Sequence, residues 1–446
     1  MTTRSDLKRF LVWTAISIVV VVVIAAIALF ALRAHYASER EAAIAAIRAN
    51  GEPLVREDIS STPRGSGEEP TQWLEEIGEL VYGEPSSAEL SECATELAAL
   101  GAEGLRRDYW KSFALAEPDP PSPCRAAMLR RDLEARGELL RRALEVGRYS
   151  SVDSTAELRS VEPFKSLGPG ANVRAAFAVA NVLGRSAIDS AVRGESEICV
   201  ERLRLAAHST ELFARAPSLI AFFARCAAIS STLHQLHAAA LLLPRDVDLS
   251  PLDRWASLLD PRAELRRVLI TERALGNSIF EQLRSSTSEE IPVFGDAPVS
   301  DALAKLRLDH DQSEYLRCMQ IGIDAAKSWD FSFVERIAPP SSSEAVTCLI
   351  LPRLNEPGPV ADFLSATRDL VRATLIARRD GVEAARAWIA AQPDPCGTAG
   401  YFVRVETDGV LTMWSVGANG IDDGGVTGHT ADPAKPLDIV ARVRTP

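Results

Sequence analysis

The sequence lacks closely spaced cysteines, an excess of positive charge and the short motifs of common enzyme sites. Its seven cysteines include no C-x-x-C pair, which argues against a zinc ribbon or a thioredoxin-like redox site. The net charge of −12 argues against broad binding to nucleic acid, because phosphate backbones attract positive surfaces. G-x-S-x-G, G-x-x-x-x-G-K-S/T and H-E-x-x-H are absent, so no motif indicates an α/β-hydrolase, a P-loop nucleotide site or a zinc protease.

Aromatic residues are also few, at 6%, whereas 47% of the residues are apolar and 25% are charged, as in an ordinary globular chain. Ala, Leu and Arg are abundant, and these residues favour helices over strands. We therefore predict a mainly α fold: an N-terminal transmembrane helix, a body of helical hairpins in a bundle or solenoid-like arrangement, and a small C-terminal antiparallel β-sheet.

One uncharged segment, Phe10–Leu32, is long enough to cross a membrane. Its 23 residues would form about 34 Å of helix, compared with a hydrocarbon core of about 30 Å. Trp13 and Tyr36 lie near its two ends, where aromatic rings favour the membrane interface. A cleaved signal peptide is the alternative, but its apolar core is usually shorter than this segment. We therefore expect one uncleaved transmembrane helix.

Basic residues on the two sides of this segment predict its orientation. Arg4, Lys8 and Arg9 crowd the short N-terminal tail, whereas Arg33 and Arg40 are spread over a longer stretch beyond the segment. Positive residues favour the cytoplasmic side of a membrane. The N-terminus is therefore expected in the cytoplasm and the bulk of the chain outside it.

The remaining sequence divides by composition and periodicity. We predict a cytoplasmic tail (1–9), a transmembrane helix (10–32), a stalk helix (33–50), a polar linker rich in Pro and Gly (51–70), an α-helical domain (71–395) and a β tail (396–446). In the helical domain, three runs within 170–243 are separated only by Gly194 and by Ala216-Pro217, which predicts antiparallel helical hairpins. Further helices are predicted at 125–146, 262–284, 299–327 and 360–391.

The last fifty residues change from helical periodicity to strand alternation. Tyr401–Val405 and Val410–Ser415 alternate apolar with polar residues around Asp408-Gly409, a dipeptide typical of a tight hairpin turn. A third short strand is predicted at Ile439–Val443. These segments predict a small antiparallel sheet.

The tail resembles a known family. The segment Trp414–Gly425 (WSVGANGIDDGG), followed by Asp438–Val443 (DIVARV), resembles the C-terminal sheet and loop of the major pseudopilins of type II secretion systems. In that family the loop holds a calcium ion. The ending is also similar to those of uncharacterised membrane-anchored bacterial proteins, notably of planctomycetes and myxobacteria. The segments Thr271–Glu281 and Arg215–Ile220 of the helical body look like theirs too.

The N-terminus departs from the pilin pattern. A pilin-type start has a Gly before the Phe and a Glu five residues into the apolar run, whereas here Arg9 precedes Phe10 and the first acid after it is Glu39. We therefore do not expect this chain to be processed or assembled as a pilin.

The Gly-rich tail loop offers candidate calcium ligands. Asn419, Asp422 and Asp423 carry hard oxygen donors, which calcium prefers. Asn-Gly and Asp-Asp-Gly-Gly are also ordinary turn sequences of a solvated loop. Both interpretations stay open at this point, and calcium is the only cofactor that the sequence suggests.

Histidines and cysteines give weaker indications. His234 and His237 lie three residues apart on a predicted helix, and antiparallel packing would bring Cys199 opposite His234, but residues at such spacing usually face water. The same packing displaces Cys199 from Cys226 by about 12 Å along the helix axes, which argues against a disulfide.

Two further polar groups complete the candidates for catalysis. Asp309-His310-Asp311 is similar to a fragment of a catalytic cluster, but the helical pattern on both sides favours a solvated helix face. His429 is expected to be a turn residue.

From these patterns we expect a single-pass protein of the bacterial inner membrane with a periplasmic body. Its expected function is that of a membrane-tethered scaffold or protein-interaction protein without catalysis. The expected partners are the membrane, through one helix, and other envelope proteins, with no nucleic acid. Two alternatives stay open: a component of a type II secretion or pilus-like machine, and an enzyme with a site built from scattered acids and histidines.

Overall fold

A computed structural model provides the fold. It describes residues 4–59, 68, 70–81, 123–150, 170–212, 218–285, 301–329, 357–397, 399–407, 409–417, 420–425 and 438–444. The chain falls into two compact units. Unit 1 combines Met1–Ile59 with Ile270–Leu354, and unit 2 combines Ser60–Leu269 with Asn355–Pro446.

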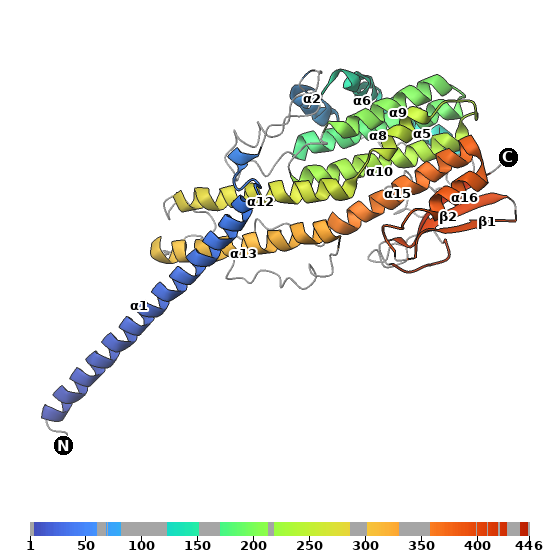
Figure 1. Cartoon of the computed structure of the whole chain (residues 1–446). Helices are drawn as coiled ribbons and strands as arrows, with labels where there is room; N and C mark the ends of the chain where they lie inside the picture. The colour runs from blue at the N-terminus through green and yellow to red at the C-terminus, as the bar shows by residue number, and fades with distance from the viewer. Residues whose placement is uncertain are drawn as a thin grey trace. The chain divides into compact units, whose positions relative to one another are not determined.

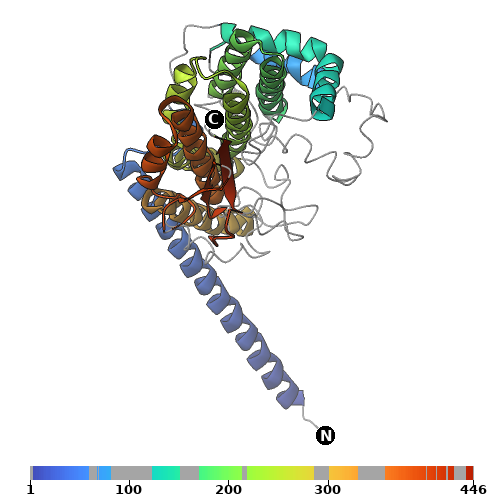
Figure 2. The ribbon, with the colours of Figure 1, turned by 90° about the vertical axis from the view of Figure 1, so that its right-hand side faces the viewer.

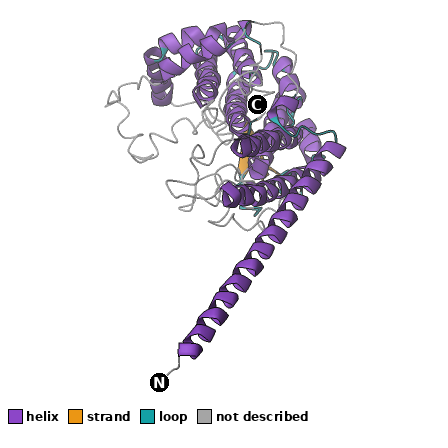
Figure 3. Cartoon of the chain, turned by 90° about the vertical axis from the view of Figure 1, so that its left-hand side faces the viewer, coloured by secondary structure: helices purple, strands orange, loops and turns teal. Residues whose placement is uncertain are grey.

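Helix α1 (Arg4–Ala49) of unit 1 confirms the predicted continuous N-terminal helix. Its 46 residues correspond to about 69 Å, and it is one unbroken rod in every view (Figures 1, 2 and 3). The side chains of residues 19–32 are all exposed, and the helix is long and apolar enough to cross a membrane. Gly51, with φ of +66°, follows the end of the helix, where a residue without a Cβ can adopt the left-handed conformation.

Two further α-helices and the short 3-10 helix η1 (Arg56–Asp58) belong to the described part of unit 1. Helix α13 (Asp301–Ser328) packs against α1, and helix α12 (Pro261–Ser285) enters the unit at Ile270. Helices α12 and α13 approach closely at Gly276, where an added Cβ would lie about 2 Å from the Tyr315 hydroxyl. Because Tyr315 is fully buried, a side chain at Gly276 would have no room.

Unit 2 contains the remaining helices. Those described are α2 (Thr71–Val81), α5 (Pro123–Ala135), α6 (Gly137–Ala143), the 3-10 helix η4 (Leu144–Arg148), α8 (Gly170–Val192), α9 (Ser196–Glu211), α10 (Leu219–Leu242), α11 (Ser250–Ser257), α15 (Pro357–Asp380) and α16 (Val382–Ala390). The three predicted helices within 170–243 are confirmed as α8, α9 and α10, which lie side by side (Figures 1 and 2). Helix α8 also packs against α2, α5 and α6 and is the centre of this group.

Helices α10 and α15 form the core of unit 2 beyond α8. Helix α10 is as apolar as a membrane span, but most of it is buried, which is typical of a core helix. Its N-cap is Ser218, whose hydroxyl accepts a hydrogen bond from Ala221 N at 3.3 Å. Helix α15 packs against α10, α11 and α16 and against strands β2 and β3. A helix surrounded in this way buries residues on all its faces.

Two predicted helices are interrupted in the structure. The prediction of one helix over 360–391 is wrong in detail, because Gly381 has φ of +95° and separates α15 from α16. Basic residues in the last turn of α15 followed by this glycine form a common helix end. The predicted run 125–146 is likewise divided, at Arg136, into α5 and α6, and η4 follows α6.

The tail forms the predicted three-stranded antiparallel sheet, whose strands are drawn as arrows in Figure 1. Strands β1 (Phe402–Val405), β2 (Val410–Ser415) and β3 (Ile439–Arg444) lie in the order β1-β2-β3. The register pairs Phe402 with Trp414, and these rings stack at a centroid distance of 5.5 Å. Because β2 is central, all six of its residues are buried.

Candidate functional site

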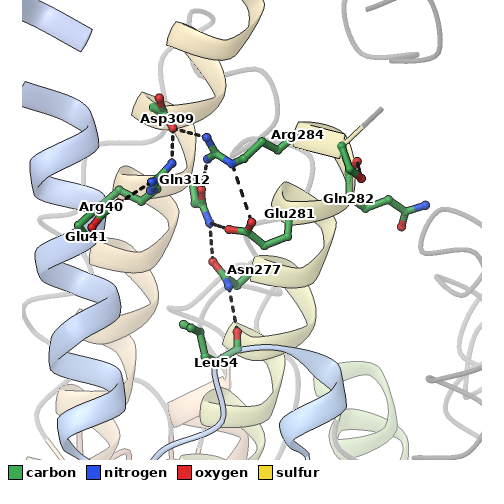
Figure 4. Close-up of polar contacts among 10 residues, drawn as sticks. Arg40, Glu41, Leu54, Asn277, Glu281, Gln282, Arg284, Asp309 and Gln312 are labelled. Atoms are coloured by element: carbon green, nitrogen blue, oxygen red, sulfur yellow. Dashed lines mark hydrogen bonds and ion pairs between the residues drawn. The ribbon is translucent and has the colours of Figure 1, made fainter. Parts of the chain in front are cut away.

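A polar cluster with a buried centre in unit 1 is built around Asp309 on α13 (Figure 4). Its carboxylate Oδ1 accepts hydrogen bonds from Arg40 Nη1 at 2.6 Å and from Arg284 Nη1 at 2.5 Å. Arg40 belongs to the stalk part of α1, and Arg284 belongs to the last turn of α12. Since Asp309 is only 4% exposed, one buried carboxylate joins three helices through two charge-assisted bonds.

The Asp309 cluster continues through two amide side chains. Arg284 Nη2 donates to Gln312 Oε1 at 2.5 Å, and Gln312 Nε2 donates to Asn277 Oδ1 and to Glu281 Oε1, both at 2.8 Å. Asn277 Nδ2 then donates to the Leu54 carbonyl at 3.0 Å. The chain of bonds therefore runs from the stalk, across α13 and α12, to the segment that follows the stalk (Figure 4).

A second set of contacts holds the segment after the stalk against α12. Arg273, which is 1% exposed, donates from Nη2 to Glu52 Oε2 and from Nη1 to Gln320 Oε1, both at 2.7 Å. The Arg56 backbone N–H donates to Ser278 Oγ at 2.7 Å. These bonds fix the chain after the turn that ends α1, and the Arg40–Asp309 bond fixes it before that turn.

The stalk presents one face to these contacts. Tyr36, Arg40, Ile44 and Ile47 recur at helical spacing and are all partly or fully buried, whereas the residues between them are mostly exposed. Tyr36 packs on the His310 ring with a centroid distance of 4.4 Å. The stalk is thus an amphipathic helix whose buried face carries both an aromatic ring and a cation.

Charge makes the Asp309 cluster sensitive to substitution. Two guanidinium groups share one buried carboxylate, and the nearby acids Glu41 and Glu281 are more exposed. Removing one partner of a buried ion pair is strongly destabilising, because the remaining charge stays in a poorly solvated position. What the cluster can do chemically is hold α1 in one position relative to α12 and α13.

The prediction of a solvated face for Asp309-His310-Asp311 is wrong for its two acids. Asp309 is 4% and Asp311 is 2% exposed. Helical periodicity on both sides was consistent with a surface helix, but α1 and α12 cover this face of α13. Among the described residues, the Asp309 carboxylate contacts two arginines.

His234 and His237 do not both face water, so that expectation is also wrong. His237 is fully buried, and its Nδ1–H donates to Thr374 Oγ1 at 3.1 Å, because the Thr374 hydroxyl proton is itself donated to the Leu370 carbonyl. His234 Nδ1–H donates to the Ser230 carbonyl at 2.6 Å, and burial lowers its pKa. The His237 ring therefore links α10 to α15, whereas the His234 ring bonds to a carbonyl of its own helix.

Two cysteines considered in the sequence are separate buried thiols. Cys199 and Cys226 are both free, as the helix geometry predicts. Burial raises the pKa of the Cys199 thiol to about 12, which keeps it protonated and unreactive at neutral pH.

Two of the predicted calcium ligands lie in the described part of the tail loop. Asp422 Oδ1 accepts hydrogen bonds from Trp414 Nε1 and from Gly424 N, both at 2.9 Å. The backbone N–H of Asp423 donates to Asp438 Oδ1 at 3.3 Å. Asn419 and His429 lie outside the described residues. Asp438, which the calcium prediction did not include, is thus part of the same loop.

Asp438 organises the loop over Trp414. Its Oδ2 accepts the Gly425 N–H at 2.8 Å, and a Cβ at Gly425, where φ is +74°, would lie 3.3 Å from the Trp414 ring. Burial raises the pKa of Asp438, and the neighbouring Asp422 and Asp423 act in the same direction. Within the described ranges, no three His, Cys, Asp or Glu side chains form a group that could hold a metal ion, so calcium stays a prediction.

A second buried carboxylate connects the tail to the helices of unit 2. Asp394, at 4% exposure, accepts from Ser415 Oγ at 2.7 Å, from Cys396 N at 2.9 Å and from Val416 N at 3.2 Å. Tyr401 donates its hydroxyl to Asp369 Oδ2 on α15 at 3.0 Å. Asp394 therefore fastens the end of β2 to the segment after α16, and Tyr401 links the start of the sheet to α15. The donors at both places are neutral.

Sequence reasoning did not identify the arginines and amides of the Asp309 cluster. Arg40 and Asp309 are 269 residues apart, and their spacing carries no local signal. Arg40 does stand out as a charged residue on the otherwise apolar face of the stalk, and this feature could have marked it. Asp438 could have been found because it directly precedes the third strand.

Comparison with protein-family models, curated proteins and solved structures finds no match for this chain. The functional argument therefore depends on its own geometry.

Proposed function

We propose that this chain is a membrane-tethered scaffold or protein-interaction protein of a bacterial envelope, with its N-terminus in the cytoplasm and its helical body in the periplasm. The observation that carries the proposal is the passage of one apolar helix, without a break, into a stalk that the Asp309 cluster fastens to α12 and α13. A protein with this design holds a folded unit at a fixed place on a membrane.

The exposed apolar part of α1 supports anchoring. Phe30 is 77% exposed and Val21 is 65% exposed, and no charged side chain interrupts residues 10–32. Such a surface is stable in lipid but costly in water. The helix thus supplies the membrane contact, and the basic residues before it favour the cytoplasm for the N-terminus.

The helical hairpins of unit 2 supply surfaces for partners. Helices α8, α9 and α10 expose large apolar side chains, among them Phe177 at 38%, Ile198 at 40% and Ile220 at 45%. Hairpins packed in this way, whether as a bundle or a solenoid, are frequent protein-binding surfaces. These three side chains are the first positions to test for protein contacts.

Photo-cross-linking in the native membrane tests the scaffold proposal. A photoreactive amino acid at Ile198 should give a discrete cross-linked product with another envelope protein. The same residue at the exposed Glu201, on the same helix, serves as the matched control. Absence of a discrete product at Phe177, Ile198 and Ile220 alike would contradict the proposal for this surface.

Reporter fusions test the orientation separately. Alkaline phosphatase fused to the C-terminus should be active, because it folds only outside the cytoplasm, whereas a fused green fluorescent protein should stay dark. The reverse pattern would place the body in the cytoplasm.

A second candidate function is a role in a type II secretion or pilus-like machine. It is favoured by the resemblance of the tail, together with the loop that Asp438 holds over the stacked Trp414. A machine component should co-purify with the secretion proteins of the same membrane after mild solubilisation. Co-purification with other proteins but never with these would favour the scaffold alone.

A further inference from the structure

The Asp309 cluster lies close to the membrane-spanning part of α1. Leu32 is the last residue of the uncharged run, and Tyr36 follows it by four residues, or about 6 Å of helix. Each headgroup layer of a bilayer is roughly 5 to 7 Å thick. Tyr36 packs on His310, so α13 already contacts α1 at the level of the headgroups if α1 spans the membrane.

Two levels of contact establish the direction of α13 relative to α1. At the lower level, nearer the transmembrane segment, Arg40 binds Asp309. At the upper level, farther from that segment, Arg273 binds both Glu52 and Gln320. Between these levels both chains advance toward higher residue numbers by similar amounts. Helices α1 and α13 therefore run in the same sense, and the start of α13 points back toward the transmembrane segment.

The length of α13 extends this contact further. Arg40 lies eight residues, or about 12 Å, beyond Leu32, and Asp301 lies eight residues before Asp309 on α13. The first turns of α13 therefore descend from the level of Arg40 to about the level at which the hydrocarbon begins. Because the axes of α1 and α13 cross at an angle, the start of α13 descends by less than its full length along α1, but it still descends.

Helix α12 connects the same two levels, but its chain runs in the opposite sense to that of α13. Arg273 lies at the upper level, next to Glu52, and Arg284 lies at the lower level, next to Asp309. The chain in α12 thus runs toward the membrane and the chain in α13 runs away from it. The end of α12 and the beginning of α13 are both on the membrane side of unit 1.

We propose that the first two turns of α13, Asp301–Leu308, lie in the lipid headgroup layer of the membrane that α1 spans. Unit 1 then rests on the bilayer surface instead of standing away from it on a free stalk. The sequence of this segment, DALAKLRL, mixes leucines with Lys305 and Arg307, a composition suited to the interface between hydrocarbon and phosphate. The proposal rests on the anchoring proposed above, and it adds a second contact with the same lipid.

Depth-dependent fluorescence quenching tests this contact. The full chain is reconstituted in phosphatidylcholine nanodiscs with one fluorescent amino acid at Val22, Ala302 or Arg317. Nitroxide lipids carry the quencher either on the headgroup or in the middle of the acyl chain. Arg317 is the matched control, because it lies on α13 eight residues, or about 12 Å, beyond Asp309 and is exposed.

The headgroup quencher should reduce the fluorescence at Ala302 several-fold more than that at Arg317, and the acyl-chain quencher should act most strongly at Val22. Equal quenching at Ala302 and Arg317, with Val22 quenched normally, overturns this inference and leaves the anchoring intact. Absence of quenching at Val22 overturns the anchoring and the inference together. Unchanged circular dichroism and melting temperature show that each labelled variant is folded.

Discussion

The Asp309 cluster of unit 1 and the Asp394 cluster of unit 2 each bury a carboxylate, but they satisfy it with different donors. Asp309 accepts hydrogen bonds from two guanidinium groups that come from other helices. Asp394 accepts from one hydroxyl and two backbone N–H groups of the tail. When a buried acid with charged partners is replaced, those partners keep their charges in a poorly solvated place. When a buried acid with neutral partners is replaced, only hydrogen-bond donors are left unsatisfied.

The substitution Asp309→Asn should produce the largest loss of stability. It leaves Arg40 and Arg284 without their shared carboxylate, and breaking a buried ion pair in this way costs about 3 to 5 kcal/mol. Denaturant unfolding of the detergent-solubilised full chain measures the change in free energy.

The matched control for this substitution is Glu314→Gln on the same helix. Among the described residues Glu314 pairs with the exposed Arg317, so its loss should cost at most about 1 kcal/mol. If both variants lose the same free energy, the Asp309 cluster does not hold unit 1 together.

Asp394→Asn sharpens the comparison between the two clusters. The amide retains one oxygen as an acceptor but brings an N–H2 group against N–H donors, so the expected cost is about 1 to 3 kcal/mol. Its effect should be smaller than that of Asp309→Asn in the same unfolding measurement. An equal or larger loss would mean that the charges of Arg40 and Arg284 do not make a buried carboxylate more costly to replace than neutral donors do.

Gly276→Ala tests how much side-chain packing contributes to the stability of unit 1, because it changes no charge. The new methyl group would meet the buried ring of Tyr315, and overpacking of a filled core costs about 1 to 3 kcal/mol. Gly137→Ala on α6 is the control, because nothing lies within 4 Å of its added Cβ, and helix propensity should make it neutral or stabilising. A neutral result at Gly276 in thermal melting would show that α12 and α13 can move apart at no cost.

The smallest expected effect concerns calcium at the tail loop. Burial raises the pKa of Asp438 above its ordinary value, so the protonated carboxyl group stabilises the folded state. This contribution to stability is lost as the pH rises through the raised pKa. A calcium ion bound at the predicted ligands Asn419, Asp422 and Asp423 would offset the loss at neutral pH. Adding calcium after EDTA treatment should therefore raise the melting temperature at pH 7 more than at pH 4, and an unchanged melting temperature at pH 7 contradicts a calcium site.

The secondary structure was accessible from the sequence because its signals are local. The uncharged run before Arg33 and the apolar spacing within 170–243 predict helices without knowledge of any partner. The Asp408-Gly409 turn likewise predicts the β1–β2 hairpin, although Asp408 itself lies outside the described residues. The interruption at Gly381 also has a local signal, because basic residues in the last turn of α15 followed by a glycine are a common helix end.

The Asp309 cluster was not accessible, because its members are close only after folding. The pattern around Asp309 has helical signals on both sides and no indication that α1 and α12 cover the acid. The grouping of 270–354 with the first 59 residues into one unit also depends on these long-range contacts, and no composition change marks it. Burial of a charged residue requires a partner, and one sequence does not name that partner.

Hydrogen exchange of α1 in nanodiscs tests the central claim most directly. In the full-length protein, backbone amides of residues 10–32 should exchange slowly because lipid excludes water, and those of 33–49 should exchange slowly because the Asp309 cluster holds the stalk. In Asp309→Asn, exchange should accelerate in 33–49 and stay slow in 10–32. Fast exchange of 10–32 in the unaltered chain, or unchanged exchange of 33–49 in the variant, would contradict a lipid-spanning helix fastened to the body through Asp309.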